Sequence, residues 1–109
     1  MPHSKQIEEK IEEVVGRWKQ IEKKKMFGGL CYLLHGNMCF GIYKDYLIIR
    51  TDIDLAEKKL KEKNVKPFDI TGKPMKGWLM VEENGLKGQV ELKNWLDMGK
   101  KFALALPKK

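Results

Sequence analysis

Apolar positions recur at helical spacing through the first part of the chain. Over residues 5–22, apolar side chains follow one another at steps of three or four, with glutamates and lysines between them. This pattern predicts an amphipathic helix, and Ser4 stands where an N-cap is expected. Gly16 interrupts the pattern, and a glycine inside a helix usually marks close packing against a neighbouring element.

The next segment has the pattern of a β-hairpin. Two apolar runs, residues 30–34 and 38–43, flank Gly36 and Asn37. This pair tolerates the positive φ angles of a tight turn. Lys44 and Asp45 form a second polar turn, and a third apolar run follows at residues 46–50. We therefore expect three consecutive antiparallel strands.

A second helix is expected after the third strand. Asp52 or Asp54 can cap it, and the helical pattern continues to about Lys63 before Asn64 ends it. The side chains expected to form its buried stripe are Ile53, Ala56, Leu60 and, less regularly spaced, Leu55.

The remaining sequence, from residue 65 onward, predicts a loop, a strand and a closing helix. Residues 65–77 contain Pro67, Gly72, Pro74 and Gly77, which favours a loop around a short extended piece near Phe68. Residues 78–82 have the pattern of a strand. The apolar stripe of the closing helix comprises Leu92, Trp95, Leu96, Phe102, Ala103 and Leu106, with Gly99 as either a close-packing point or a break.

These elements define a fold class. Their order is α-β-β-β-α-β-α, with one further short strand expected near Phe68. Helices at the ends and in the middle of an antiparallel sheet imply a two-layer α+β sandwich. At 109 residues the chain is long enough for one core, so we expect a single domain over residues 1–109.

The turn assignment predicts which side chains share a face. If Gly36 and Asn37 form a two-residue turn, Leu34 pairs with Cys39 and Leu33 with Phe40. The face expected to meet the helices then carries Cys31, Leu33, His35, Met38, Phe40, Ile42, Leu47 and Ile49. The opposite face carries Tyr32, Leu34, Cys39, Gly41, Tyr43, Tyr46, Ile48 and Arg50.

The second face contains every tyrosine of the chain and one of its two arginines. Tyrosine suits a surface that is covered only part of the time, because its ring is apolar and its tip is polar. Tyr32, Tyr43, Tyr46 and Arg50 are therefore the candidate partner surface. The alternative is an outer sheet face that merely tolerates aromatic side chains.

The two cysteines are expected to be free and structural. Cys31 and Cys39 fall on opposite faces in this register, which excludes a disulfide between them. Unpaired cysteines agree with a reducing cytoplasm, and residues 1–9 lack the apolar run of a secretory signal. No metal site, cofactor or catalytic residue is expected, because nucleotide-binding glycine motifs and metal-ligand spacings are absent.

The formal charge is +7, from 22 basic and 15 acidic residues. A basic balance raises the expectation of an anionic partner, and nucleic acid is the first candidate. Only Arg17 and Arg50 are arginine, however, and lysine cannot make the bidentate contacts that read bases or grip phosphate.

Two segments together resemble a known family. Residues 25–41 read KMFGGLCYLLHGNMCFG and residues 68–78 read FDITGKPMKGW. They are similar to the landmark segments of the TfoX N-terminal domain family, and the resemblance spans about residues 10–106. The motif residues are Met26, Phe27, Gly28, Gly29, Gly36, Met75, Lys76, Gly77 and Trp78.

The resemblance implies a fold similar to type III secretion chaperones and a small non-enzymatic binding module. The family is named for a bacterial regulator of DNA-transformation competence, which has a second domain. A chain of 109 residues leaves no room for that domain, so we expect a stand-alone N-terminal domain. The family defines no catalytic residues, so none are carried over.

Three functions remain open at this point. The first is a protein-interaction or regulatory module, acting on a protein partner or as a homodimer in the cytoplasm. The second is a nucleic-acid-binding domain in transcription, using lysines at 23–25, 58–66 and 100–109 with stacking tyrosines. The third is a small-molecule pocket or enzyme, suggested only by the reactive types Cys39, Arg50 and Lys76.

Overall fold

A computed structural model describes residues 5–18, 21–26, 29–68, 76–86 and 88–107 of the chain. In chain order the elements are α1 (Lys5–Val15), β1 (Ile21–Met26), β2 (Gly29–Leu34), β3 (Asn37–Tyr43), β4 (Tyr46–Arg50), α2 (Ile53–Lys59), β5 (Val65–Pro67), β6 (Trp78–Glu82), the 3-10 helix η1 (Glu83–Leu86) and α3 (Gln89–Ala105). This order confirms the predicted α+β class, and β5 is the short strand expected near Phe68.

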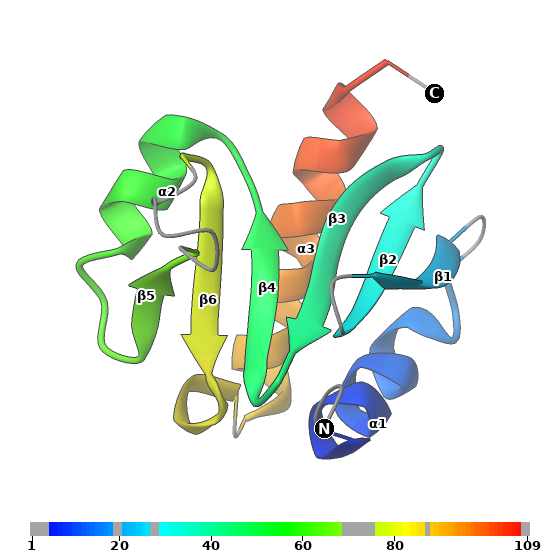
Figure 1. Cartoon of the computed structure of the whole chain (residues 1–109), viewed down its shortest axis with the longest axis horizontal. Helices are drawn as coiled ribbons and strands as arrows, with labels where there is room; N and C mark the ends of the chain where they lie inside the picture. The colour runs from blue at the N-terminus through cyan, green and yellow to red at the C-terminus, as the bar shows by residue number, and fades with distance from the viewer. Residues whose placement is uncertain (1–4, 19–20, 27–28, 69–75, 87, 108–109) are drawn as a thin grey trace.

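The sheet has six strands in the order β1-β2-β3-β4-β6-β5, and all neighbours are antiparallel. Figure 1 shows α3 crossing behind the sheet, with α1 below β2 and α2 beside β6. One buried cluster joins the inner face of the sheet to all three α-helices, through Ile7 and Ile11 of α1, Ala56 of α2 and Leu96 of α3. The molecule is therefore a two-layer sandwich with its main core between sheet and helices.

The first helix is shorter than predicted, and a strand was missed. α1 ends at Val15, and Gly16 follows it, its N–H donating to the Glu12 carbonyl at 2.9 Å. β1 then pairs with β2 along its whole length. Its sequence, IEKKKM, carries three consecutive lysines, which hides the period-two alternation by which a strand is normally recognised. An edge strand tolerates this composition because only one side of it is paired.

The hairpin turn lies one residue earlier than predicted. His35 and Gly36 form the turn, with φ angles of 52° and 82°, and Leu34 pairs with Asn37. Asn37 is instead the first residue of β3, where its buried amide donates to the Pro107 carbonyl at 2.9 Å. This bond ties the turn to the segment after α3.

A β-bulge changes the register again between Tyr32 and Leu33. Leu33 pairs with Met38 but Tyr32 pairs with Phe40, so Cys39 is an extra residue on β3. The earlier turn alone moves the pairing by two residues and keeps each side chain on its predicted face. The bulge adds a shift of one residue, which moves Tyr32, Leu34 and Met38 to the opposite face from the one predicted. The residues that belong to the main core against expectation are Tyr32, Leu34 and Cys39.

The pairing of β3 with β4 is as predicted, with Ile42 opposite Leu47 and Phe40 opposite Ile49. These four side chains are fully or almost fully buried in the main core. On the other face of the sheet, Ile48, Phe68 and Met80 form a second, smaller buried cluster. Partly buried side chains around it are Met38, Tyr43, Tyr46 and Trp78. The outer face of the sheet therefore carries a small buried apolar cluster and is not uniformly exposed to solvent.

α3 is one continuous helix, so Gly99 is a close-packing point and not a break. A Cβ built on Gly99 would lie 2.2 Å from the Cys39 carbonyl oxygen of β3. That separation is far below van der Waals contact, and the neighbour is backbone, which cannot rotate away.

We therefore predict that Gly99→Ala destabilises the protein by about 1–3 kcal/mol, the usual range for overpacking a core. Alanine raises helix propensity by up to about 1 kcal/mol, so a loss of stability isolates the packing effect. Urea unfolding followed by circular dichroism measures it, with Lys101→Ala on the exposed side of α3 as control. A Gly99→Ala variant as stable as the wild type would contradict the close approach.

Candidate functional site

The four residues of the candidate partner surface do not form one surface. Tyr43 and Tyr46 lie opposite each other at one end of β3 and β4, half-buried on the outer face. Arg50 lies at the other end of β4, four residues away, which is about 13 Å at strand spacing. The prediction that Tyr32 joins them is wrong, because the bulge turns Tyr32 into the main core.

Tyr32 is 1% exposed and packs against Phe40, with ring centroids 5.2 Å apart. Its hydroxyl is enclosed and makes no hydrogen bond of ordinary geometry with the described residues. Burial raises the pKa of this hydroxyl, and the carboxylates of Glu12 and Glu8 raise it further. Tyr32 is therefore a neutral core residue beneath α1, closed to a partner.

Arg50 is the residue around which a site does form. Its guanidinium carbon lies 5.4 Å from the Trp78 ring centroid and 5.4 Å from the Phe102 ring centroid. Trp78 is its neighbour on β6, and Phe102 comes from α3, so the arginine joins the two layers of the fold. Arg50 makes no ion pair with a carboxylate of the described residues, and its contacts with the two uncharged rings leave its positive charge in place.

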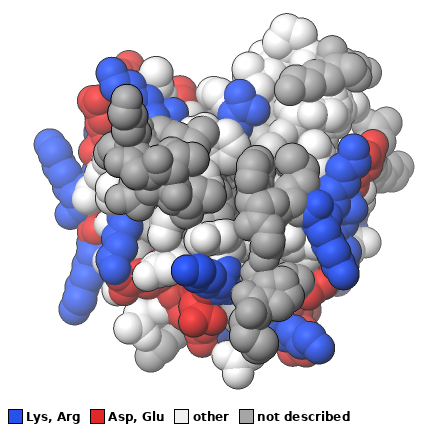
Figure 2. Space-filling view, in the orientation of Figure 1, with Lys and Arg blue, Asp and Glu red and all other residues white. Residues whose placement is uncertain are grey.

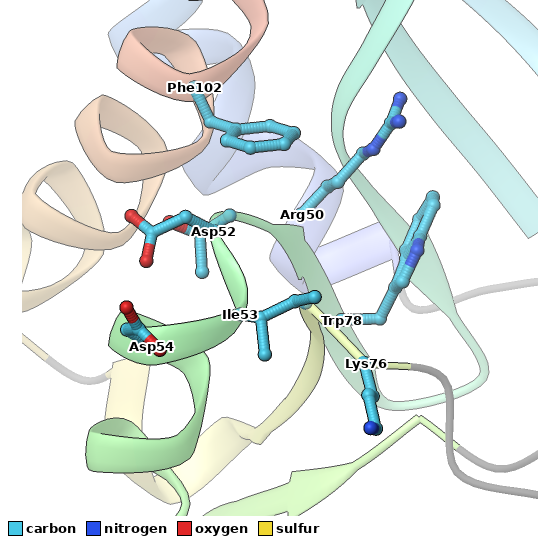
Figure 3. Close-up of a pocket in the computed structure, with 9 residues that line it drawn as sticks. Arg50, Asp52, Ile53, Asp54, Lys76, Trp78 and Phe102 are labelled. Atoms are coloured by element: carbon cyan, nitrogen blue, oxygen red, sulfur yellow. The ribbon is translucent and has the colours of Figure 1, made fainter.

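These side chains line a pocket of about 580 Å³, here called the Arg50 pocket. Its walls are Arg50, Thr51, Asp52, Ile53, Asp54, Lys76, Gly77, Trp78 and Phe102. Figure 3 shows Arg50 between Phe102 and Trp78. Lys76 points away from Arg50, and the carboxylates of Asp52 and Asp54 lie on the side away from Trp78. The volume is in the range of ordinary ligand pockets, about 300–1,000 Å³.

The second family motif supplies one wall of this pocket. Gly77 has a φ angle of +83°, and its carbonyl accepts the Thr51 N–H at 2.8 Å. A Cβ on Gly77 would lie 2.8 Å from the Thr51 carbonyl oxygen, so both the φ angle and the space favour glycine. Lys76 is exposed at the rim and Trp78 is half-buried. The motif therefore places a cation and an aromatic ring on either side of a tight turn.

The first family motif has a structural role where it is described. Gly29 faces the Ile42 carbonyl so closely that a Cβ would lie 2.1 Å from its oxygen. Gly36 occupies the positive-φ position of the hairpin turn. Met26 ends β1. Phe27, Gly28 and Met75 lie outside the described residues, as does the Met26 side chain.

Both aspartates of the pocket have a part in α2. The Asp52 carboxylate accepts the Leu55 N–H at 2.8 Å, so Asp52 and not Asp54 is the N-cap. Asp54 lies in the first turn, where a carboxylate stabilises the helix dipole. Arg50 and Lys76 have no such local role among the described residues. The pocket can therefore bind an anionic group beside apolar surface.

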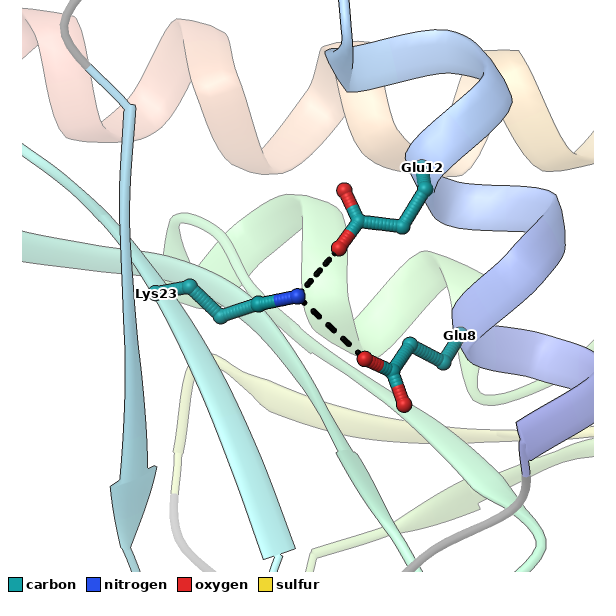
Figure 4. Close-up of polar contacts among 3 residues, drawn as sticks. All are labelled: Glu8, Glu12 and Lys23. Carbon is teal, nitrogen blue, oxygen red and sulfur yellow. Dashed lines mark hydrogen bonds and ion pairs between the residues drawn. The ribbon is translucent and has the colours of Figure 1, made fainter.

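Three of the lysines invoked for nucleic-acid binding have partners close by in the structure. Lys23 forms ion pairs with Glu12 and, at 3.3 Å, with Glu8, which raises its pKa and holds β1 to α1 (Figure 4). Lys66 pairs with Glu82 at 3.0 Å, and Lys100 lies 4.4 Å from the Trp18 ring centroid. Figure 2 shows lysines and acidic residues interspersed around one face of the molecule.

Both cysteines are free, as predicted, and both are buried. The bulge places Cys39 in the main core rather than on the outer face, and its thiol donates to the Tyr32 carbonyl at 3.2 Å. Burial raises the pKa of both thiols, that of Cys39 to about 12. Cys39 is therefore separated from Arg50 and Lys76. Within the described ranges, no three His, Cys, Asp or Glu side chains gather as metal ligands would.

Fold and pocket together define a small α+β domain with an arginine-centred pocket. The chain belongs to the TfoX N-terminal domain family, whose profile matches residues 13–103. This is not an enzyme family. Searches of curated proteins and of solved structures gave no match. Among the helices in the described ranges, none has both the length and the apolar character to cross a membrane.

We predict that Tyr32→Phe leaves stability unchanged or raises it by up to about 1 kcal/mol, because it removes a buried hydroxyl that lacks a good partner. Thermal and urea unfolding measure the change, with Tyr43→Phe as the half-buried control. A loss above about 1 kcal/mol would mean that the hydroxyl is hydrogen-bonded to a carboxylate of α1 instead.

The thiol pKa shifts predict an alkaline loss of stability. An unfolded thiol loses its proton near pH 9, whereas Cys39 keeps its proton to about pH 12 when folded. Its contribution is therefore complete below pH 9 and declines as the pH rises from 9 toward 12.

Urea unfolding across this pH range should show a shallower decline for Cys39→Ala than for the wild type. The wild type at pH 8 should also resist a thiol reagent until it is unfolded. Rapid labelling of the native protein would contradict the buried placement of both cysteines.

Proposed function

We propose that this chain is a non-enzymatic binding module in a regulatory role, and that it holds part of a protein partner in the Arg50 pocket. The observation that carries the proposal is the position of the Arg50 guanidinium, whose carbon lies 5.4 Å from the ring centroids of both Trp78 and Phe102. Contact with two rings restricts this side chain before a partner arrives, which reduces the loss of side-chain entropy on binding.

Aromatic and arginine side chains are the types that most often dominate protein interfaces. The pocket brings together Arg50, Trp78 and Phe102, with Ile53 at 48% exposure beside them. Family membership supports the same class of function, because the second family motif contributes Lys76, Gly77 and Trp78 to the walls.

The sheet edges favour the pocket over strand pairing as the binding mode. β1 presents Lys23, Lys24 and Lys25 along one edge. β5, at the other edge, has three residues and ends in Pro67, which has no N–H to donate. Lysines, short strands and proline are the usual means by which proteins prevent edge-to-edge association. Association with a second copy through an edge is therefore disfavoured.

The nucleic-acid hypothesis draws less support from the arrangement. Lys23, Lys59 and Lys66 each pair with a glutamate, at separate places on the molecule. A duplex or single strand is bound by a continuous basic stripe. Tyr43 and Tyr46 are half-buried against the outer cluster, which limits their use for stacking on bases.

A photo-crosslinking amino acid at position 53 tests the proposal in the cells to which the chain is native. We expect a discrete protein adduct from position 53, and its loss when Arg50→Met is added. The matched control is position 90, because Val90 is 70% exposed but lies at the start of α3, outside the pocket. No adduct from position 53, or the same adducts from both positions, would overturn the proposal.

A further inference from the structure

The apolar stripe of α2 is only partly covered by the rest of the chain. Of the side chains predicted to be buried, Ala56 is buried, whereas Ile53 is 48% and Leu60 is 37% exposed. Seven residues separate Ile53 from Leu60, so both lie on the same side of the helix. The other large hydrophobic side chains exposed within the described ranges are Val90 and Leu104, both on α3. An exposed apolar stripe on a short helix indicates an interaction surface.

A cavity of about 100 Å³ lies along this stripe. Leu60 and Pro67 are among the residues that line it, and it shares Ile53, Lys76, Gly77 and Trp78 with the Arg50 pocket. The two spaces adjoin at these four shared residues, and together they are here called the groove, which extends from Leu60 to Arg50. Over the seven residues of α2 the groove is about 10 Å long, the span of three or four extended residues.

The Arg50 end of the groove selects the charge of the occupant. The guanidinium carbon lies 5.4 Å from each of the two ring centroids, and no carboxylate of the described residues pairs with it, so its N–H groups can bind a ligand. A planar carboxylate fits these donors in a bidentate manner. Asp52 and Asp54 stand in the same pocket, where they would repel a doubly charged phosphate more than a singly charged carboxylate.

We infer that the groove along α2 binds a short extended peptide segment of a protein partner, with a carboxylate against Arg50 and an apolar side chain against Ile53 and Leu60. The inference rests on the proposed function and specifies the chemistry of the same site. The carboxylate belongs to a glutamate or aspartate side chain, or to the end of the partner chain. Lys76 lies between the two ends and contributes a second, exposed positive charge.

The probes are two tetrapeptides, acetyl-Leu-Ala-Ala-Glu-amide and acetyl-Glu-Ala-Ala-Leu-amide, because the direction of the chain is open. Each is titrated into the ¹⁵N-labelled protein, and shifts of the Gly77 amide and the Trp78 indole N–H are followed. We expect saturable shifts from one of the two, weakened at least fivefold when Glu is replaced by Gln and again when Leu is replaced by Ala. A third arm uses acetyl-Leu-Ala-Ala-Ala with a free carboxyl terminus, which distinguishes the two sources of the carboxylate.

Arg50→Lys keeps the charge but removes the planar fork, and we expect it to weaken the glutamate peptide about tenfold. Arg17→Lys, at the only other arginine of the chain, should leave binding unchanged. Leu60→Ser should weaken the peptide independently of Arg50, and a dispersed amide spectrum verifies the fold of each variant. Equal affinity for the Glu and Gln peptides without tighter binding of the free-carboxyl peptide, no saturable shift from any of the three peptides, or equal shifts from inorganic phosphate alone would overturn the inference.

The crosslinking and peptide experiments together distinguish a failure of the inference from a failure of the proposed function on which it rests. If crosslinking from position 53 stays specific to the pocket while the peptides show no preference for glutamate or for a free carboxyl terminus, the binding module stands and the carboxylate assignment is wrong. If crosslinking from position 53 also fails, the pocket is not the binding site at all.

Discussion

The close approach of α3 to β3 sets the geometry of the whole molecule. At Gly99 the helix backbone comes so near the Cys39 carbonyl that no side chain fits between them. One turn before this point, Trp95 reaches α2, where the Lys59 ammonium lies 5.5 Å from its ring centroid. Three residues after it, Phe102 reaches the end of β4 and covers Arg50. A single contact thus fixes the distance at which α3 meets both α2 and the pocket.

On the sheet side of this contact, Cys39 is the extra residue of the β-bulge. The bulge bends β3 and turns Tyr32 and Leu34 inward, where they join Phe40 in the main core. The outer face loses a tyrosine and is left with the small cluster around Ile48. For the proposed function, the consequence is that the candidate binding site moves from the middle of the sheet to the end of β4, where the helix layer and the sheet layer meet.

Much of this architecture was predictable from the sequence, because it rests on strong periodicity. The three helices, the pairing of Ile42 with Leu47 and the free cysteines all followed from local patterns. The turn did not, because Gly36 can be either the first or the second residue of a two-residue turn, and His35 gave no signal for a positive φ angle. A bulge has no sequence signature in a run as apolar as residues 37–43. The bulge, which shifts the register by a single residue, was enough to misplace Tyr32.

The site was foreseen in its parts but not as a whole. Arg50 was selected for its place beside the tyrosines, and Lys76 and Trp78 for their motif, with nothing in the sequence to show that they meet. They meet because β4 and β6 are neighbours in the sheet, although 27 residues separate Arg50 from Gly77 in the chain. Phe102 was assigned to the buried stripe of α3, and only the crossing point at Gly99 reveals that it leaves the core to cover Arg50.

The family motifs therefore mark geometry more than chemistry. Gly29 and Gly36 allow the hairpin to close, and Gly77 allows the chain to turn tightly enough for Lys76 and Trp78 to flank Thr51. None of these positions needs a reactive group, since their role is to hold an arginine, two rings and a lysine at the mouth of one groove. In the function proposed above, a protein built in this way recognises a partner by shape and charge, and its specificity depends on the apolar stripe of α2, whose exposed Ile53 and Leu60 line the groove.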